Sequence, residues 1–478
     1  MALGDKVFGA MAWSAIERLL LQGIQFILGI VLARILSPEE YGVMAILMVF
    51  IVFSSVFIDS GFSMALTQKI NRTENDKSTV LLFNLGISIF CYCLLWISSK
   101  EIAKFYEILE LEILLKFIGV SLIINALYTV PNTLFTIQLD FKSITKINLI
   151  AVVISGIFAI FLALNGFGVW SLVYQVLLKS VLTLVFTWFL IKWWPNWTFS
   201  KKSFKELFSY GSKLLASSLL AHTFSNINTL LIGKYISAKE LGFYSRGTQF
   251  SDVVFNVFNS SINNVLLPGL APLQNDKSKL VLHSKTIIRS TTLVVLPAFL
   301  TLSILAEPII IILLTDKWAK AIPIMQLFSI ARLVTIIGGI NMNILYVIGR
   351  TDLVLRQQYL CIAIRAILVL SALPFGIFYI ALAELTTSII HFFINAYFPG
   401  KLLGYKAINQ IKDNLLILFS GVVMALLLYS TFFLFNDYLT QLLVTPVIAI
   451  VAYFLMLYYL KVHELFMLIE KIKGFFSR

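Results

Sequence analysis

Apolar residues dominate the chain, in runs of roughly 20 positions separated by short polar loops. A run of that length crosses the bilayer core as an α-helix, because a helix pairs its own backbone polar groups. The pattern predicts an all-α polytopic membrane protein with about fourteen transmembrane helices. The predicted spans are residues 9–33, 43–66, 79–99, 113–138, 145–165, 169–192, 210–233, 243–268, 289–314, 322–348, 358–380, 381–399, 414–436 and 439–460.

The sequence of one polar loop occurs twice in the chain. The sequence LSPEEYG occupies residues 36–42 and ISAKELG occupies residues 236–242, each after an apolar run. The flanking helices also repeat their polar positions at helical spacing, which places a polar stripe on each of them. The stripe on the first span includes Ser14, Gln22 and Gln25, and the stripe on the seventh includes Ser218, His222 and Ser225.

The repetition indicates a duplicated unit of six helices. Because six is even, both copies begin on the same side of the membrane, so we expect two parallel repeats with their polar stripes lining a central cavity. The predicted organisation is an N-lobe at 1–195, a cytosolic linker at 196–209, a C-lobe at 210–400, two extra helices at 401–460 and an amphipathic cytosolic tail at 461–478. In the tail, Leu465, Phe466, Ile469, Ile472 and Phe476 recur at helical spacing between lysines.

Composition and charge agree with this class. The chain of 478 residues is 59% hydrophobic and only 13% charged, whereas a soluble domain carries about 25% charged residues. With the N-terminus in the cytosol, the inner segments hold 24 of the 37 Lys and Arg residues, the outer loops hold eight and the spans hold the other five. This bias predicts that both termini are cytosolic. It also accounts for the net charge of +13 without nucleic-acid binding.

The sequence contains no motif for a bound cofactor. The three cysteines lie inside apolar runs, and the four histidines are scattered without metal-ligand spacing. We therefore predict no disulfide, no metal site and no cofactor, apart from a coupling H⁺ or Na⁺.

Three segments resemble a known family. They are LSPEEYGVMAILMVFIVFSSVFIDSGFSMALTQK (36–69), LGFYSRGTQF (241–250) and PGLAPLQND (268–276). The chain is similar there to the polysaccharide-transport branch, the Wzx-type flippases, of the multidrug/oligosaccharidyl-lipid/polysaccharide exporter superfamily. The resemblance implies two V-shaped six-helix lobes in the bacterial inner membrane. It also implies that the cargo is a lipid-pyrophosphate-linked oligosaccharide, moved from the cytosolic to the periplasmic leaflet. It names no site residues.

Candidate site residues come instead from charge at membrane depth, which is costly and marks functional sites. Arg18 is the leading candidate, because it lies mid-span on the stripe of the first helix. Arg332, Arg365 and Lys179 could complete a cationic cavity, since guanidinium and ammonium groups bind pyrophosphate oxygens. The alternative is that Glu17 with Arg18, or Asp59 with a nearby arginine, forms a buried structural ion pair.

Two acids are candidates for ion coupling. Glu17 lies beside Arg18, and Asp59 ends the second span just before Gly61. Asp59 could bind a coupling H⁺ or Na⁺, or it could cap a helix break at that glycine. The latter role is the favoured one.

Two other functions compete with a flippase. An ion-coupled drug antiporter with the same lobes would favour acidic residues in its cavity, whereas here mid-span arginines outnumber convincing mid-span acids. A membrane glycosyltransferase or polymerase would need a sizeable loop with catalytic carboxylates, and the acidic outer loop 99–112 is short. We therefore expect a transporter rather than an enzyme. Its predicted partners are lipid-linked oligosaccharide, membrane lipid, and a polysaccharide polymerase with its assembly proteins, without nucleic acid.

Overall fold

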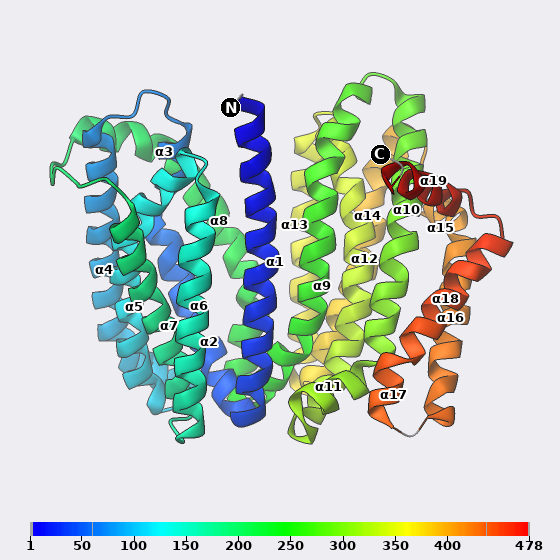
Figure 1. Ribbon diagram of the computed structural model, residues 1–478, viewed down its shortest axis with the longest axis horizontal. Helices are drawn as coiled ribbons and strands as arrows, with labels where there is room; N and C mark the ends of the chain where they lie inside the picture. Colours follow the sequence, from blue (N-terminus) through cyan, green and yellow to red (C-terminus); the bar gives the residue numbers. More distant parts are fainter. Residues whose placement is uncertain (1–2, 60, 436, 477–478) are drawn as a thin grey trace. The chain divides into compact units, whose positions relative to one another are not determined.

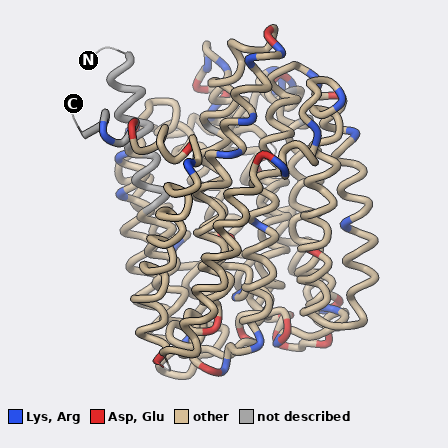
Figure 2. The backbone as a smooth tube through the Cα atoms, turned by 90° about the vertical axis from the view of Figure 1, so that its right-hand side faces the viewer, with Lys and Arg blue, Asp and Glu red and all other residues tan. Residues whose placement is uncertain are grey.

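The computed structural model describes residues 3–59, 61–435 and 437–476, and no strand occurs among them. A helix lies at each of the fourteen predicted positions. The described residues divide into two compact units, residues 1–242 and 243–478. Figure 2 shows Lys, Arg, Asp and Glu gathered near the ends of the helices, with few between, as expected for helices that cross a bilayer.

The first unit runs from α1 to α8 and includes the start of α9, as labelled in Figure 1. Their bounds are α1 Leu3–Ile35, α2 Pro38–Asp59, α3 Phe62–Gln68, α4 Glu74–Tyr106, α5 Glu110–Ile137, α6 Phe141–Leu164, α7 Val169–Leu190, α8 Lys201–Tyr235 and α9 Ala238–Leu270.

Most of α9 and all later elements belong to the second unit. Their bounds are η1 Ala271–Leu273, α10 Lys277–Ile304, α11 Ala306–Leu314, η2 Asp316–Ala321, α12 Ile322–Val347, α13 Thr351–Ala372, η3 Leu373–Phe375, α14 Ile377–Leu403, α15 Ala407–Asp413, α16 Leu415–Leu434, α17 Tyr438–Leu443, α18 Thr445–Tyr459 and α19 His463–Phe476.

Local sequence sets several helix ends. Thr73 and Asp76 form a capping box at the start of α4, in which each side chain accepts a hydrogen bond from the backbone of the other residue. Gly61 separates α2 from α3 with a φ of 70°, a conformation that glycine adopts at no steric cost. Gly376, with a φ of 96°, separates η3 from α14. The predicted boundary at 380/381 is therefore wrong by a few residues, because this glycine ends the preceding helical run before the apolar pattern does.

Eleven helices are long and apolar enough to cross a membrane among the residues described, so the full count of fourteen is not confirmed. Two predicted spans, α8 and α9, do not qualify, and the described side chains of α1 include only the shorter apolar stretch Leu20–Ile35. Helices α8 and α9 are long enough, at 35 and 33 residues. Their polar side chains lower the hydropathy, so these helices need protein or water on part of their surface.

The core of the first unit explains why α8 belongs to it. Phe62, Leu66, Leu81 and Leu207 are buried together where α3, α4 and α8 meet. Because α8 packs on α2, α3 and α4, the first compact unit extends to residue 242, whereas the predicted lobe boundary lies at 196–209. The division into lobes by sequence repetition stays a prediction.

The second unit has its main core around α10, α12, α16 and α18. Leu296, Phe299, Met424 and Tyr453 are buried in it. Helix α19 lies where the sequence predicts an amphipathic tail and packs Leu465 into the same core. An ion pair of 2.8 Å between Arg289 and Glu464 also joins α19 to α10.

Candidate functional site

Lys179 lies in the middle of α7, a helix apolar enough to span the membrane. Helix α7 packs against α2, α5 and α6 in the first unit. The side chain is half-buried. Within the described residues it has neither an ion pair nor a hydrogen bond. An uncompensated cation at membrane depth is costly, so Lys179 keeps the properties of a ligand-binding residue.

Arg332 is held by α9. Its Nε donates to Oδ1 of Asp252 over 2.7 Å. Its guanidinium lies 5.0 Å from the ring centroid of Phe255 and 5.5 Å from that of Phe328. The predicted binding residue is therefore part of an ion pair flanked by two aromatic faces, each of which favours a nearby cation.

Arg365 has its own acid on the next helix. Its Nε donates to Oε1 of Glu384 on α14 over 2.8 Å. Glu384 is 8% exposed, and one helical turn away Ser388 donates its hydroxyl to the Glu384 carbonyl oxygen. Nε2 of His391 lies 2.9 Å from the carbonyl oxygen of Cys361. The Arg365–Glu384 and His391–Cys361 contacts thus both join α13 to α14.

These two ion pairs show that Arg332 and Arg365 are not unpaired cations. In the second unit each predicted arginine is neutralised by a carboxylate, an arrangement that the sequence analysis considered only for Arg18 and Asp59. The prediction does not include Asp252 among the site residues. The sequence could have indicated this residue, because Asp252 falls inside the predicted span 243–268, where a carboxylate needs a partner.

The polar stripes are described in part. The side chains of Ser14, Glu17 and Arg18 lie outside the described residues, so their predicted roles stay predictions. On α1, Gln22 is half-buried and Gln25 is exposed.

The stripe of α8 presents three polar side chains. Ser218 and His222 are half-buried, and Ser225 is exposed. The Ser225 hydroxyl donates to the His222 carbonyl oxygen over 3.1 Å and accepts a hydrogen bond from the Asn226 side-chain amide over 3.2 Å.

Asp59 occupies the break between α2 and α3. Its Oδ1 accepts from the hydroxyl of Ser63 and, at 3.4 Å, from the Ser63 backbone N–H in the first turn of α3. The carboxylate therefore supports the helix start after Gly61, which was the favoured structural role. Its role in ion coupling stays a prediction.

The two copies of the repeated loop, residues 36–42 and 236–242, contact each other in the first unit. A Cβ added to Gly42 would lie 1.7 Å from the carbonyl oxygen of Ala238, and one added to Gly242 would lie 1.8 Å from that of Pro38. These are equivalent contacts with the partners exchanged, since both pairs are matched at the offset of 200 residues. Only glycine permits the two helix starts to approach so closely.

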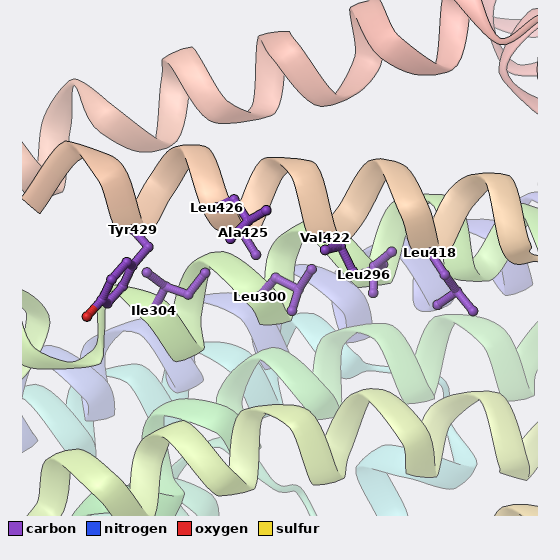
Figure 3. A pocket seen from close by; sticks show the side chains of 8 residues that line it. All are labelled: Leu296, Leu300, Ile304, Leu418, Val422, Ala425, Leu426 and Tyr429. Atoms are coloured by element: carbon purple, nitrogen blue, oxygen red, sulfur yellow. The ribbon is translucent and has the colours of Figure 1, made fainter.

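An apolar groove of about 400 Å³ lies between α10 and α16. Figure 3 shows Leu296, Leu300 and Ile304 reaching it from α10, opposite side chains of α16. The α16 side chains are Leu418, Val422, Ala425, Leu426 and Tyr429. None of the lining residues is charged, so the groove suits a hydrocarbon chain. The described residues contain no group of three or more His, Cys, Asp or Glu that could hold a metal ion.

Comparisons with known proteins place this chain in a family. The family model described as "Polysaccharide biosynthesis protein" (Polysacc_synt_3) matches residues 31–323, more than half of the chain. The teichuronic acid biosynthesis protein TuaB of Bacillus subtilis is 26% identical over 355 residues, which cover 74% of this chain and 73% of that protein. The lipopolysaccharide biosynthesis protein WzxC of Escherichia coli is 24% identical over 359 residues, covering 74% and 72%.

A solved structure shares the fold across almost the whole chain. The lipid II flippase MurJ, in an inward closed conformation, has a TM-score of 0.73 at 18% identity, covering 94% of this chain and 98% of that one. At this identity the likeness shows the fold alone. It agrees with the all-helical, multi-pass architecture described above, and the resemblance predicted from the three sequence segments is confirmed. The chain belongs to the polysaccharide biosynthesis protein family.

Proposed function

We propose that this protein is a flippase for surface-polysaccharide biosynthesis. It moves a lipid-pyrophosphate-linked oligosaccharide from the cytosolic to the periplasmic leaflet of the bacterial cytoplasmic membrane by alternating access. The product is an O-antigen, a capsule or an exopolysaccharide. Relatives named for teichuronic acid and lipopolysaccharide biosynthesis support this class of cargo, and the shared fold with a lipid II flippase supports the lipid-linked form. In this proposal the protein performs no covalent chemistry, and both termini are cytosolic.

The observation that carries the proposal is the uncompensated Lys179. A lipid-linked pyrophosphate brings about two negative charges to membrane depth, where a cation without its own acid gains most from a phosphate partner. Lys179 is half-buried in a spanning helix and has no ion pair among the described residues. It therefore provides the charge that such a cargo requires.

The polar helices and the apolar groove support the two other parts of the cargo. Helices α8 and α9 are too polar to qualify as lipid-facing spans, and their hydroxyl and amide groups suit sugar hydroxyls. The groove between α10 and α16 provides an apolar surface for the lipid chain.

The arginine pairs suggest how cargo and a coupling ion could be exchanged. A pyrophosphate that takes Arg332 or Arg365 would release Asp252 or Glu384, and a released carboxylate at membrane depth takes up a proton or a sodium ion. Coupling through these acids, or through Glu17 and Asp59, is part of the proposal.

The test is transport by Lys179 variants. Purified protein in liposomes is given a fluorescent lipid-pyrophosphate oligosaccharide, and the labelled fraction reached by external dithionite reports its movement across the bilayer. Lys179→Gln should reduce the rate at least tenfold, whereas Lys179→Arg should retain much of it, because the charge is kept. The matched control is Lys116→Gln, because Lys116 also lies in a spanning helix but has its own acid, Glu112, at 2.6 Å.

Two outcomes would overturn the proposal. Normal transport by a stable Lys179→Gln protein would remove the cargo role of this lysine. The antiporter alternative would be established instead if the wild-type protein did not move the lipid-linked sugar but exported a cationic drug in exchange for an ion that enters down its gradient.

A further inference from the structure

The connection between α7 and α8 is extended and presents aromatic side chains outward. In residues 191–196, side chains alternate between buried and exposed, as an extended backbone requires. Ile191, Trp193 and Pro195 are buried. Trp194 and Trp197 are instead 76% and 61% exposed. Large exposed aromatic side chains of this kind mark a contact with another surface.

Hydrogen bonds hold this connection in one conformation. Trp193 donates its indole N–H to Oε2 of Glu74 over 2.6 Å. The backbone N–H of Asn196 donates to Oγ of Ser78 over 3.0 Å, and that of Ser200 donates to Oγ1 of Thr79 at the same distance. All three acceptors lie in the first two turns of α4, which the connection crosses in Figure 1. The exposed tryptophans are therefore carried on a fixed support.

The backbone at Trp197 is also unusual. Its φ is +54°, a conformation that a bulky side chain adopts only at an energetic cost. Strain of this kind persists where the surrounding contacts enforce it and occurs often at functional sites. Here it accompanies an indole that faces away from the unit.

Four lysines lie close to these aromatic residues in the sequence. Lys192, Lys201, Lys202 and Lys205 are all exposed, and none has an ion pair with a described residue. The neighbouring acids are engaged elsewhere: Glu74 pairs with Lys77, whereas Asp76 and Glu206 both pair with Lys69. This face is therefore positive as well as aromatic.

The end of α7 fixes the depth of this face in the bilayer. Helix α7 qualifies as a spanning helix and ends at Leu190, only two residues before Lys192. Phe189, in its last turn, is 84% exposed and continues the apolar surface of the span. Residues 192–205 thus leave the hydrocarbon at the level of the lipid headgroups, where tryptophan is favoured and lysines attract anionic lipids.

We propose that residues 192–205 form a binding surface for anionic phospholipid headgroups. The indoles of Trp194 and Trp197 enter the headgroup region, while the four lysines bind the phosphate charges. The rigid attachment to α4 favours binding, because little conformational entropy is lost. The proposal does not depend on the identity of the transported cargo.

Brominated lipids provide the test, since bromine quenches tryptophan at contact. Full-length protein is placed in nanodiscs containing brominated phosphatidylglycerol or brominated phosphatidylcholine. The signal of Trp194 and Trp197 is obtained by subtracting the spectrum of the W194F/W197F variant. We expect the anionic lipid to quench this signal at a lower mole fraction than the zwitterionic lipid.

The lysines are tested with a matched triple variant. K201Q/K202Q/K205Q should lower the preference for phosphatidylglycerol by about fivefold for each lysine removed. The control K277Q/K406Q/K412Q removes three other exposed lysines without ion pairs, and no tryptophan adjoins them in the sequence. It should leave the preference unchanged, and thermal melting should show that both variants remain folded.

Three results would overturn the proposal. Equal quenching by the two lipids would show that the surface does not select for charge. An equal loss in both triple variants would show a general effect of net charge. Absence of quenching by either lipid would show that the two indoles do not reach the bilayer, and an acidic protein partner would then be the remaining occupant.

Discussion

At the scale of single residues, two glycines allow the two copies of the loop to approach each other closely. Gly42 and Gly242 each lie against the carbonyl oxygen of the residue that begins the other helix segment, Ala238 or Pro38. Both copies of the loop thus require a residue without a side chain at this position. Sequence comparison pairs these glycines by position, and the structure gives the physical reason why both positions hold glycine.

We predict that Gly42→Ala and Gly242→Ala each destabilise the protein by about 3 kcal/mol or more, at the upper end for an overpacked site. A backbone carbonyl cannot move aside as a flexible side chain can. Thermal melting in detergent should show a clear fall in the midpoint for both variants. The control is Gly86→Ala in α4, whose added Cβ would have no atom within 4 Å. If either loop variant melts like Gly86→Ala, the close packing of the two loops is wrong.

At the scale of elements, a lysine joins three helices at one end of the first unit. Lys69, just after α3, lies 3.0 Å from Asp76 on α4 and 3.1 Å from Glu206 on α8. Burial lowers the pKa of Lys69, but the hydrogen bonds to the two carboxylates outweigh this effect and raise it above its ordinary value of 10.5. Because the folded-state pKa is raised, the stabilisation is fully present below pH 10.5 and is lost as the pH rises through the higher folded value.

Lys69→Met should therefore destabilise the first unit. Asp76 is only 1% exposed, and removing the partner of a buried charge costs about 3–5 kcal/mol. The double variant Lys69→Met/Asp76→Asn should recover part of the loss, since no buried charge then remains unpaired. Lys104→Met is the control, because its pair with Glu101 is exposed and contributes at most about 1 kcal/mol. Equal melting temperatures for the two single variants would contradict the role of Lys69.

At the scale of the whole molecule, the sequence predicts that the two copies of the loop face the same side of the membrane. Positions 39 and 239 are exposed in the structure, so a thiol placed there is open to reagents. In a background without native cysteines, Glu39→Cys and Lys239→Cys should both react with a membrane-impermeant maleimide in intact cells. Lys201→Cys should react only after the cells are opened. Labelling of one loop but not the other would exclude a parallel repeat and favour an inverted one.

The sequence by itself determined the class of protein and the position of its helices. Apolar runs must be helical in a bilayer because nothing else there satisfies the backbone, and a helix lies at every predicted position. A prediction based on neighbouring residues also agrees with the structure. Asp59 supports the helix start after Gly61, as its place before the glycine suggested. The family resemblance came from the same short segments.

The tertiary structure alone decided which charged residues are paired. Arg332 and Asp252 are 80 positions apart in the chain, and no local pattern joins them. The assignment of α8 to the first unit likewise depends on packing against α2, α3 and α4, although the repeat in the sequence begins a new copy there. Side-chain contacts between distant helices depend on how the helices pack in three dimensions, whereas hydropathy and capping are properties of neighbouring residues. For this reason the sequence predicted the spans well, and only the structure separated the paired arginines from the uncompensated Lys179.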